Sequence, residues 1–269
     1  TGFNFDFLQH VFTSPQTRPG NWKFFCSRFE LEQGSLAFRD YEMEPEMVDL
    51  LNLEEIDLVL DETKILNKNN LSLAIKKMSF KTFNGFILSQ FSTSCVYADS
   101  IFKMNAIKAK TSNSSIQINT IELALADYLT SKKAEDISFK LDLKSIDLGI
   151  RDLSFFIDST FNIDTKTKMS GKLYGNMLNL RGRDLQLSVE NFTSLNADFS
   201  IDGLNDLKSA YIFLNLNESY ANLNEIRNLD LPPGIEKAIN NLPAFFDNVG
   251  TFSYKGNFTG FLDDFVAYG

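Results

Sequence analysis

The segment Ile137-Ser-Phe-Lys-Leu-Asp-Leu-Lys-Ser-Ile-Asp-Leu-Gly-Ile150 decides the fold, because its apolar pattern returns further along the chain. Its apolar residues alternate with polar ones at a period of two, which is the pattern of a strand with one buried and one wet face. Similar alternation dominates the rest of the 269 residues. Such strands favour an antiparallel sheet, which covers one face and leaves the other in water.

The same series of features occurs twice. The first copy runs from Ile137 to Gly171-Lys-Leu-Tyr-Gly-Asn-Met-Leu-Asn-Leu180, and the second from Tyr211 to Gly256-Asn-Phe-Thr-Gly-Phe-Leu-Asp-Asp-Phe265. Each copy ends with a Gly-x3-Gly unit, three residues, an acid or amide, and a large apolar residue. A weak repeat built on strands predicts an elongated sheet that grows by added units, since each unit needs neighbours to bury its apolar face.

The repeat divides the chain into three continuous segments. We expect an amino-terminal β segment at 1–136, a first repeat unit at 137–210, and a second unit with a helical insertion at 211–269. The sequence begins without Met and ends inside a strand-like pattern, so we expect it to be a piece of a longer protein.

The apolar positions change parity inside some strands. They are odd in Leu71–Ile75 and even in Met78–Phe80, and the same change occurs within 141–150. A flip within a continuous run predicts a β-bulge that bends the strand while its apolar side keeps facing the same interior. The sequence therefore predicts a curved sheet.

Breaks in the strand pattern are few. Gln33-Gly34 predicts a turn between two strands, and helical spacing is confined to 6–12, 223–229 and 235–242, the last flanked by Pro233 and Pro243. We expect short amphipathic helices at the ends of a sheet.

The composition narrows the classes of partner. Apolar residues make up 43% of the chain, and 26 phenylalanines must be hidden in a core or against an apolar ligand. The net charge of −9 and the lack of a basic run argue against nucleic acid. Cys26 and Cys95 form no framework, and buried thiols are favoured over a disulfide. No apolar run reaches the roughly 20 residues that span a bilayer.

No constellation of residues predicts catalysis. His10 is the only histidine, so neither a histidine metal cluster nor a Ser–His pair is expected. The Gly-x3-Gly units lie within strand alternation, which does not fit a phosphate loop. Asp57, Asp61, Asp263 and Asp264 are interpreted as wet-face carboxylates. We therefore expect no enzyme activity, no cofactor and no metal.

The apolar stripes leave two architectures open. A closed sandwich would pack the stripes against one another, whereas a sheet curled into an open trough would present them to an apolar guest. Alternation alone fits both.

Several short motifs nevertheless follow a recognisable order. They are Gly2–Leu8, Trp22, Phe29–Asp40, Met78–Phe80, Asn84–Phe86, Ile107–Thr111, Asn113–Ile116, Ser145–Leu148, Arg151–Leu153 and the two Gly-x3-Gly units. This order resembles the amino-terminal half of the TamB family, the inner-membrane subunit of the translocation and assembly module, in its Bacteroides-type form. That family belongs to the AsmA-like group of bridge-like lipid transfer proteins.

The resemblance implies an elongated, curved antiparallel sheet that forms an apolar, β-taco-like trough in the periplasm of a Gram-negative bacterium. It implies an inner-membrane anchor that precedes Thr1 and a TamA-type outer-membrane partner contacted through regions outside this chain. The implied activity is passage of phospholipid between the two membranes in support of outer-membrane biogenesis. The family has no catalytic motif.

The trough interpretation selects the residues that line the groove. We expect the acyl chains of phospholipid to lie against Ile56, Leu58, Leu60, Leu71, Leu73, Ile75, Ile121, Leu123, Leu125, Phe139, Leu141 and Leu143. One alternative is a scaffold for outer-membrane β-barrel assembly through strand pairing. Another is an extracellular adhesin or binding domain, which the single tryptophan supports poorly.

Overall fold

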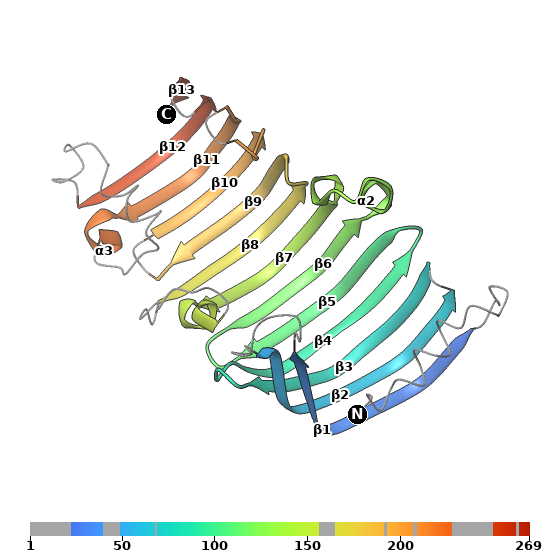
Figure 1. The fold of residues 1–269 in the computed structure, drawn as a ribbon. Helices are drawn as coiled ribbons and strands as arrows, with labels where there is room; N and C mark the ends of the chain where they lie inside the picture. Colours follow the sequence, from blue (N-terminus) through green and yellow to red (C-terminus); the bar gives the residue numbers. More distant parts are fainter. Residues whose placement is uncertain are drawn as a thin grey trace.

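One antiparallel sheet of thirteen strands, in chain order from β1 to β13, makes up nearly all of the structure (Figure 1). The computed structural model describes residues 23–39, 49–67, 69–155, 165–190, 193–206, 209–227, 250–261 and 264–269. The sheet stays open, because β1 and β13 lie at its opposite edges. This confirms the predicted all-β fold with an elongated antiparallel sheet.

Each strand pairs with the strands before and after it in the chain. The strands are β1 (Phe24–Arg39), β2 (Asp49–Asn67), β3 (Asn70–Thr82), β4 (Ile87–Ala98), β5 (Ile101–Thr111), β6 (Ser115–Ala124), β7 (Ser138–Gly149), β8 (Lys166–Gly175), β9 (Asn179–Val189), β10 (Thr193–Asp202), β11 (Tyr211–Asn222), β12 (Thr251–Gly260) and β13 (Phe265–Tyr268). The helices within the described residues are α2 (Ala126–Ser131), α3 (Leu223–Arg227) and the 3₁₀ helices η1 (Ala134–Asp136) and η2 (Ile150–Phe155).

The two Gly-x3-Gly units occupy equivalent places in the sheet. Each glycine pairs with an apolar residue of the preceding strand: Gly171 with Leu143, Gly175 with Phe139, Gly256 with Leu216 and Gly260 with Ile212. Helix η2 follows β7 and α3 follows β11, and both lie at the same side of the sheet (Figure 1). The repeat in the sequence is therefore a repeat of register.

The second glycine of each unit ends its strand in a conformation that L side chains rarely adopt. Gly175 has φ +145° and Gly260 has φ +138°. A β-carbon at Gly175 would lie 1.9 Å from the carbonyl oxygen of Asn179, and one at Gly260 would lie 2.5 Å from that of Asp264. Both positions therefore require glycine so that the chain can enter a tight turn.

The parity flips are β-bulges, as predicted. In β3, Ile75 pairs with Leu60 and Met78 pairs with Leu58, and the register shifts between them. Leu58 and Leu60 are two residues apart in β2 and so face the same side. The extra residue within Lys76-Lys77 therefore leaves the apolar side of β3 unchanged while it bends the strand.

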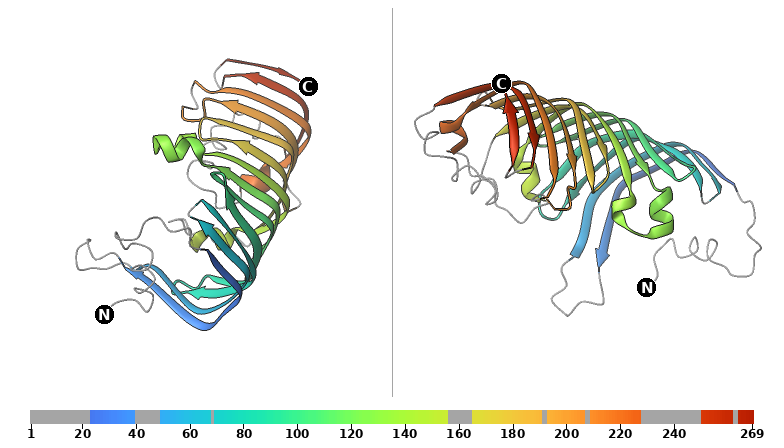
Figure 2. Two further views of the ribbon diagram at one scale, coloured as in Figure 1. Left: turned by 90° about the vertical axis from the view of Figure 1, so that its right-hand side faces the viewer. Right: turned by 90° about the horizontal axis from the view of Figure 1, so that it is seen from above.

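These bulges recur across the sheet. The pairs Lys144-Ser145 in β7 and Asn217-Glu218 in β11 repeat the bulge of β3 at intervals of four strands. In β5 and β9 the register shifts at Ala106 and Asp184, which have φ of +52° and +50°. Since bulges increase bend and twist, their alignment gives the arched cross-section in Figure 2.

The prediction of a turn at Gln33-Gly34 is wrong. Strand β1 continues through both residues, and the register with β2 shifts around them. A Gln-Gly pair is compatible with either a turn or a β-bulge. Here the carboxylate of Asp57 on β2 accepts the Gln33 N–H at 3.2 Å and stabilises a bulge. Asp198 accepts the Asp184 N–H at 2.9 Å in the same way. These backbone hydrogen bonds are the main cause that lowers the pKa of both carboxyl groups.

The helices agree only in part with the sequence prediction. Within the candidate at 223–229, α3 covers Leu223–Arg227, while the candidates at 6–12 and 235–242 lie outside the described residues. The periodicity did not predict α2, η1 or η2, because each has six residues or fewer and is too short to display a helical repeat.

Replacing Gly175 with alanine tests the requirement for glycine at the end of β8. The new β-carbon would meet the Asn179 carbonyl, so we expect the free energy of unfolding to fall by about 1–3 kcal/mol. Urea unfolding followed by circular dichroism measures the change. The control is Gly250→Ala, whose β-carbon would meet only Asn224 Nδ2 at 3.5 Å. Equal losses in both variants would contradict the prediction.

Candidate functional site: the apolar face of the trough

The register traces continuous rows of side chains across one face of the sheet, because directly paired residues project to the same side. Row 1, nearest α2, contains Ile65, Leu71, Tyr97, Phe102, Leu123, Phe139, Gly175, Leu180, Ile201, Ile212, Gly260 and Phe265. Row 2 contains Leu73, Cys95, Met104, Ile121, Leu141, Leu173, Gly182, Phe199, Leu214, Phe258 and Ala267. Row 3, nearest η2, contains Leu31, Leu58, Met78, Phe91, Ala109, Ile116, Ile146, Met169, Leu187, Leu195, Ser219 and Tyr254.

The residues predicted to line the groove fall on this face, with one exception. Row 1 holds Leu71, Leu123 and Phe139; row 2 holds Leu73, Ile121 and Leu141; and row 3 holds Leu58. Between rows 2 and 3 lie Leu60, Ile75 and Leu143, and beyond row 3 lies Ile56, opposite Gly34. Whether they contact lipid stays a prediction.

The exception is Leu125. Strand β6 ends at Ala124, and Leu125 has φ −109° and ψ 0° immediately before α2. Its N–H bonds to the carbonyl of Ser100 at 2.8 Å, and its own carbonyl accepts the N–H of Leu129 at 2.9 Å. Leu125 is therefore a helix-capping residue, and its assignment to a strand is wrong.

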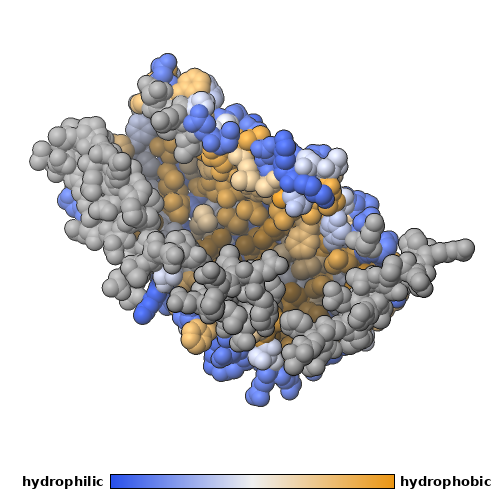
Figure 3. Space-filling model, in the orientation of Figure 1, coloured by the Kyte–Doolittle hydropathy of each residue, from blue (hydrophilic) through white to orange (hydrophobic). Residues whose placement is uncertain are grey.

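The side chains on the apolar face are less buried than those in the core of a closed domain. Among the described residues no large side chain is fully buried, and most members of the three rows are half-buried. Figure 3 shows apolar residues gathered along the middle of this face and hydrophilic residues toward its edge. Within the described residues the sheet is thus a trough and has no second strand layer, which rules out the predicted sandwich alternative there.

Sequence reasoning missed several members of the rows. Cys95, Met104 and Met169 belong to the apolar face only because their register partners do. Gly182 belongs to it because the ring of Phe199 lies over it, 2.5 Å from where a β-carbon would be. These residues can be assigned to the apolar face from strand pairing, but not from the sequence pattern within a single strand.

The two cysteines form no disulfide with each other. Cys95 is buried in row 2, where burial raises the pKa of its thiol, whereas Cys26 on β1 is partly exposed. The predicted buried thiol therefore applies to Cys95 alone.

The opposite face of the sheet is charged. Glu122 lies between Lys103 and Lys140, with oxygen–nitrogen distances of 3.6 and 3.0 Å, and the hydrogen bond from Lys140 is the main cause that lowers its pKa. Asp57 pairs with Lys77 at 3.1 Å, as expected of a wet-face carboxylate. Exposed pairs of this kind contribute little stability but keep the outer face in water.

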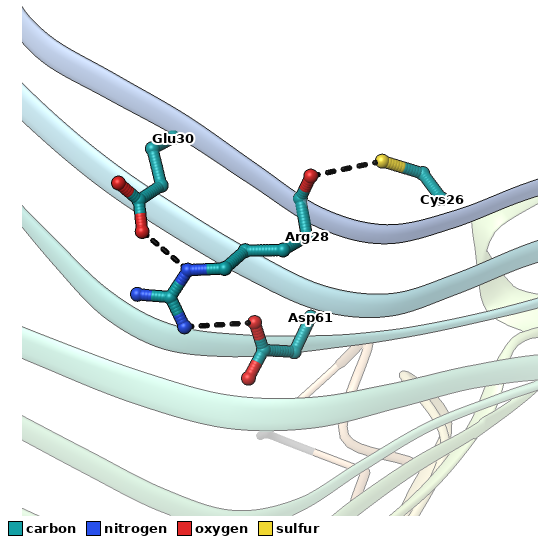
Figure 4. Close-up of polar contacts among 4 residues, drawn as sticks. All are labelled: Cys26, Arg28, Glu30 and Asp61. Atoms are coloured by element: carbon teal, nitrogen blue, oxygen red, sulfur yellow. Dashed lines mark hydrogen bonds and ion pairs between the residues drawn. The ribbon is translucent and has the colours of Figure 1, made fainter.

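The edge strand β1 bears charged side chains (Figure 4). Arg28 pairs with Glu30 on the same strand and, at 3.5 Å, with Asp61 on β2. The Cys26 thiol donates to the Arg28 carbonyl at 3.3 Å. Charged side chains on an edge strand oppose indiscriminate pairing with other chains.

A buried polar cluster lies where β7 enters η2. Asp152 is 4% exposed, and its carboxylate accepts hydrogen bonds from the hydroxyls of Thr111 and Ser114 and, at 2.8 Å, from Asn113 Nδ2. The Ser114 hydroxyl in turn accepts the Gly149 N–H at 3.1 Å. Burial is the largest single influence and raises the pKa of Asp152, but the hydrogen bonds together outweigh it and leave the pKa below its ordinary value.

A hollow opens at the other ends of the strands. Its volume is about 530 Å³, and its mostly apolar lining includes Met177, Leu178 and Leu204 beside Lys133. The carbonyl of Leu178 accepts the N–H groups of Gly203 and Leu204 at 2.9 and 2.8 Å, so two turns are joined there.

Metal ligands do not gather anywhere in the described part of the chain, where no three His, Cys, Asp or Glu side chains come together to hold an ion. His10 and Asp263 lie outside the described residues, and Asp264 is exposed in the turn before β13. No described helix is both long and apolar enough to cross a membrane.

No family model, curated protein or solved structure matches this chain. The interpretation of the site accordingly rests on its geometry, and the resemblance to TamB stays a prediction. The geometry of the described residues offers an extended apolar surface (Figure 3).

The pH dependence of stability tests the Asp152 cluster through Asp152→Asn. Because the folded pKa lies below the unfolded value of about 3.9, stabilisation by the carboxylate is complete above that value and is lost as the pH falls through the folded pKa. We therefore expect the wild type to be more stable than the variant at pH 7, and the difference to shrink below about pH 4. Urea midpoints across this range measure it. A difference that is constant from neutral to acid pH would contradict the prediction.

Proposed function

We propose that the trough binds the acyl chains of phospholipid and is a segment of a periplasmic bridge along which lipid passes between the inner and outer membranes. The observation that carries the proposal is the continuity of the apolar rows: row 3 is apolar through paired residues from Leu31 in β1 to Leu195 in β10, and row 2 holds no polar residue from Leu73 in β3 to Ala267 in β13. An exposed apolar surface of this extent is unfavourable in water unless something apolar covers it.

The dimensions suit lipid. Thirteen strands about 4.8 Å apart make a trough roughly 58 Å long, about twice the ~30 Å hydrocarbon thickness of a bilayer. Each methylene that leaves water gains about 0.8 kcal/mol without any specific polar contact. Since nearly all members of the rows are apolar, a chain can shift along the trough at little cost, as transport requires.

The wider setting comes from the resemblance alone. A TamB-like protein would be anchored in the inner membrane, would contact a TamA-type partner through regions outside this chain, and would support outer-membrane biogenesis. The proposal includes these partners and a periplasmic location. It assigns no enzymatic step and no cofactor.

Substitutions that introduce a charge into the trough test lipid binding. Leu58→Asp and Leu141→Asp each place a carboxylate in a row, and we expect bound phospholipid to fall by at least about tenfold, since a charged side chain in hydrocarbon costs several kcal/mol. The matched control is Val59→Asp, one residue along β2 and on the outer face beside Lys77. Native mass spectrometry of the purified proteins counts the lipid, and circular dichroism verifies folding. Equal lipid in all four proteins would contradict the proposal.

A second candidate function is strand pairing with nascent outer-membrane proteins. Strand β1 is 16 residues long and pairs only with β2 in the described structure, and its Phe25 side chain is 61% exposed. A free edge of this length accepts an added strand through backbone hydrogen bonds.

Cross-linking from the edge tests this second function. A photoreactive residue at Ser27 in β1 should cross-link to nascent β-barrel proteins, whereas one at Lys168 in the interior strand β8 should not. Gel shifts and peptide mass spectrometry identify the products. Cross-linking at neither position, or equally at both, would refute strand pairing at β1.

A further inference from the structure

The Asp152 cluster supplies hydrogen bonds to a buried carboxylate and also joins two distant parts of the chain. Burying a charge is unfavourable unless hydrogen bonds compensate it, so such a group is kept where it fixes something in place. Its donors, Thr111, Asn113 and Ser114, all come from the end of β5 and the turn that follows it, whereas Asp152 is part of η2. The cluster therefore ties η2 to a turn that is distant in the sequence.

Close backbone packing reinforces this tie. A β-carbon on Gly149, the last residue of β7, would lie 2.6 Å from Asn113 Cβ. The Gly149 N–H also donates to Ser114 Oγ. The chain thus turns from β7 into η2 while pressed against the β5–β6 turn.

The far end of η2 reaches the apolar side of the sheet. The ring of Phe155 meets the ring of Phe86 edge-on, with centroids 5.7 Å apart, and Phe86 lies 6.2 Å from Phe80. Phe80 follows Met78 of row 3 by two residues in β3 and so faces the trough. Asn84 Nδ2 also donates to the Phe155 carbonyl at 3.4 Å. Helix η2 therefore extends from β7 back to the β3–β4 turn.

We propose that η2, locked by Asp152, is a fixed side wall of the trough, so that lipid that enters or leaves through a side of the trough, between its β1 and β13 ends, does so at the opposite strand ends, beside α2. This inference rests on the proposed lipid binding. The wall lies at the ends of strands β3 to β7 on the row 3 side (Figure 1). The side beside α2 has the apolar hollow at Met177, whose side chain is 59% exposed. Lys133 and Glu135 also line this hollow and form an ion pair at 3.7 Å.

Two variants loosen the wall in different ways. Asp152→Asn removes the charge that accepts the hydroxyl donors, and Phe155→Ala removes the ring contact while the cluster stays intact. Their controls are Asp264→Asn, exposed in the β12–β13 turn, and Phe83→Ala, whose ring is 84% exposed beside the same β3–β4 turn.

Amide hydrogen exchange and lipid release together test the proposal on the whole chain. We expect both loosened variants to exchange the amides of 150–155 at least about tenfold faster and to release a phospholipid with a fluorescent acyl chain several-fold faster into phosphatidylcholine vesicles. Both controls should match the wild type. A second pair of variants, Met177→Asp and its neighbour Asn176→Asp, should slow uptake of the same lipid only when Met177 is changed.

The outcomes separate the two proposals. Unchanged exchange at 150–155 in both variants would refute the lock, whatever the lipid does. Faster exchange with unchanged lipid release would refute the wall. If the wild type takes up no phospholipid at all, the proposed function fails and the wall fails with it, while the exchange result still decides the role of Asp152.

Discussion

The sheet depends on agreement between its bulges and its apolar pattern. An extra residue in a strand would turn every following side chain to the opposite face. In β3 the apolar positions change from odd to even at Lys76-Lys77, where the register shifts, and in β7 they change at Lys144-Ser145. The strand can therefore bend without presenting polar residues to the trough. Curvature and a continuous apolar face thus have a common origin.

Sequence information was sufficient where the deciding forces are local. Period-two alternation identified the strands and their apolar side, and the parity flips located the bends. The Gly-x3-Gly units were placed correctly within strands, because glycine before a tight turn has a local cause in the φ of Gly175 and Gly260. Local reasoning failed at Gln33-Gly34, since the carboxylate that makes it a bulge belongs to Asp57, 24 residues further on.

The same limit explains what was missed at the candidate site. Asp152 takes its donors from 38 to 41 residues earlier in the chain, and no pattern within one segment links the two. Membership of Cys95 and Met104 in row 2 likewise depends on register between strands. Residues such as Leu58 and Leu141 lie on one face because alternation determines the side of the sheet to which a residue points, although it does not determine the residue's neighbours. Their contact with lipid stays a prediction.

Because the same bulge recurs every four strands, the width of the trough and its length are set by different features of the sheet. The bend within each strand sets the cross-section, while the number of strands sets how far the trough reaches. Insertion of one more four-strand unit would extend the sheet by about 19 Å and leave the cross-section unchanged. Duplication of such a unit is thus a simple evolutionary route by which the trough can change its length without changing its width.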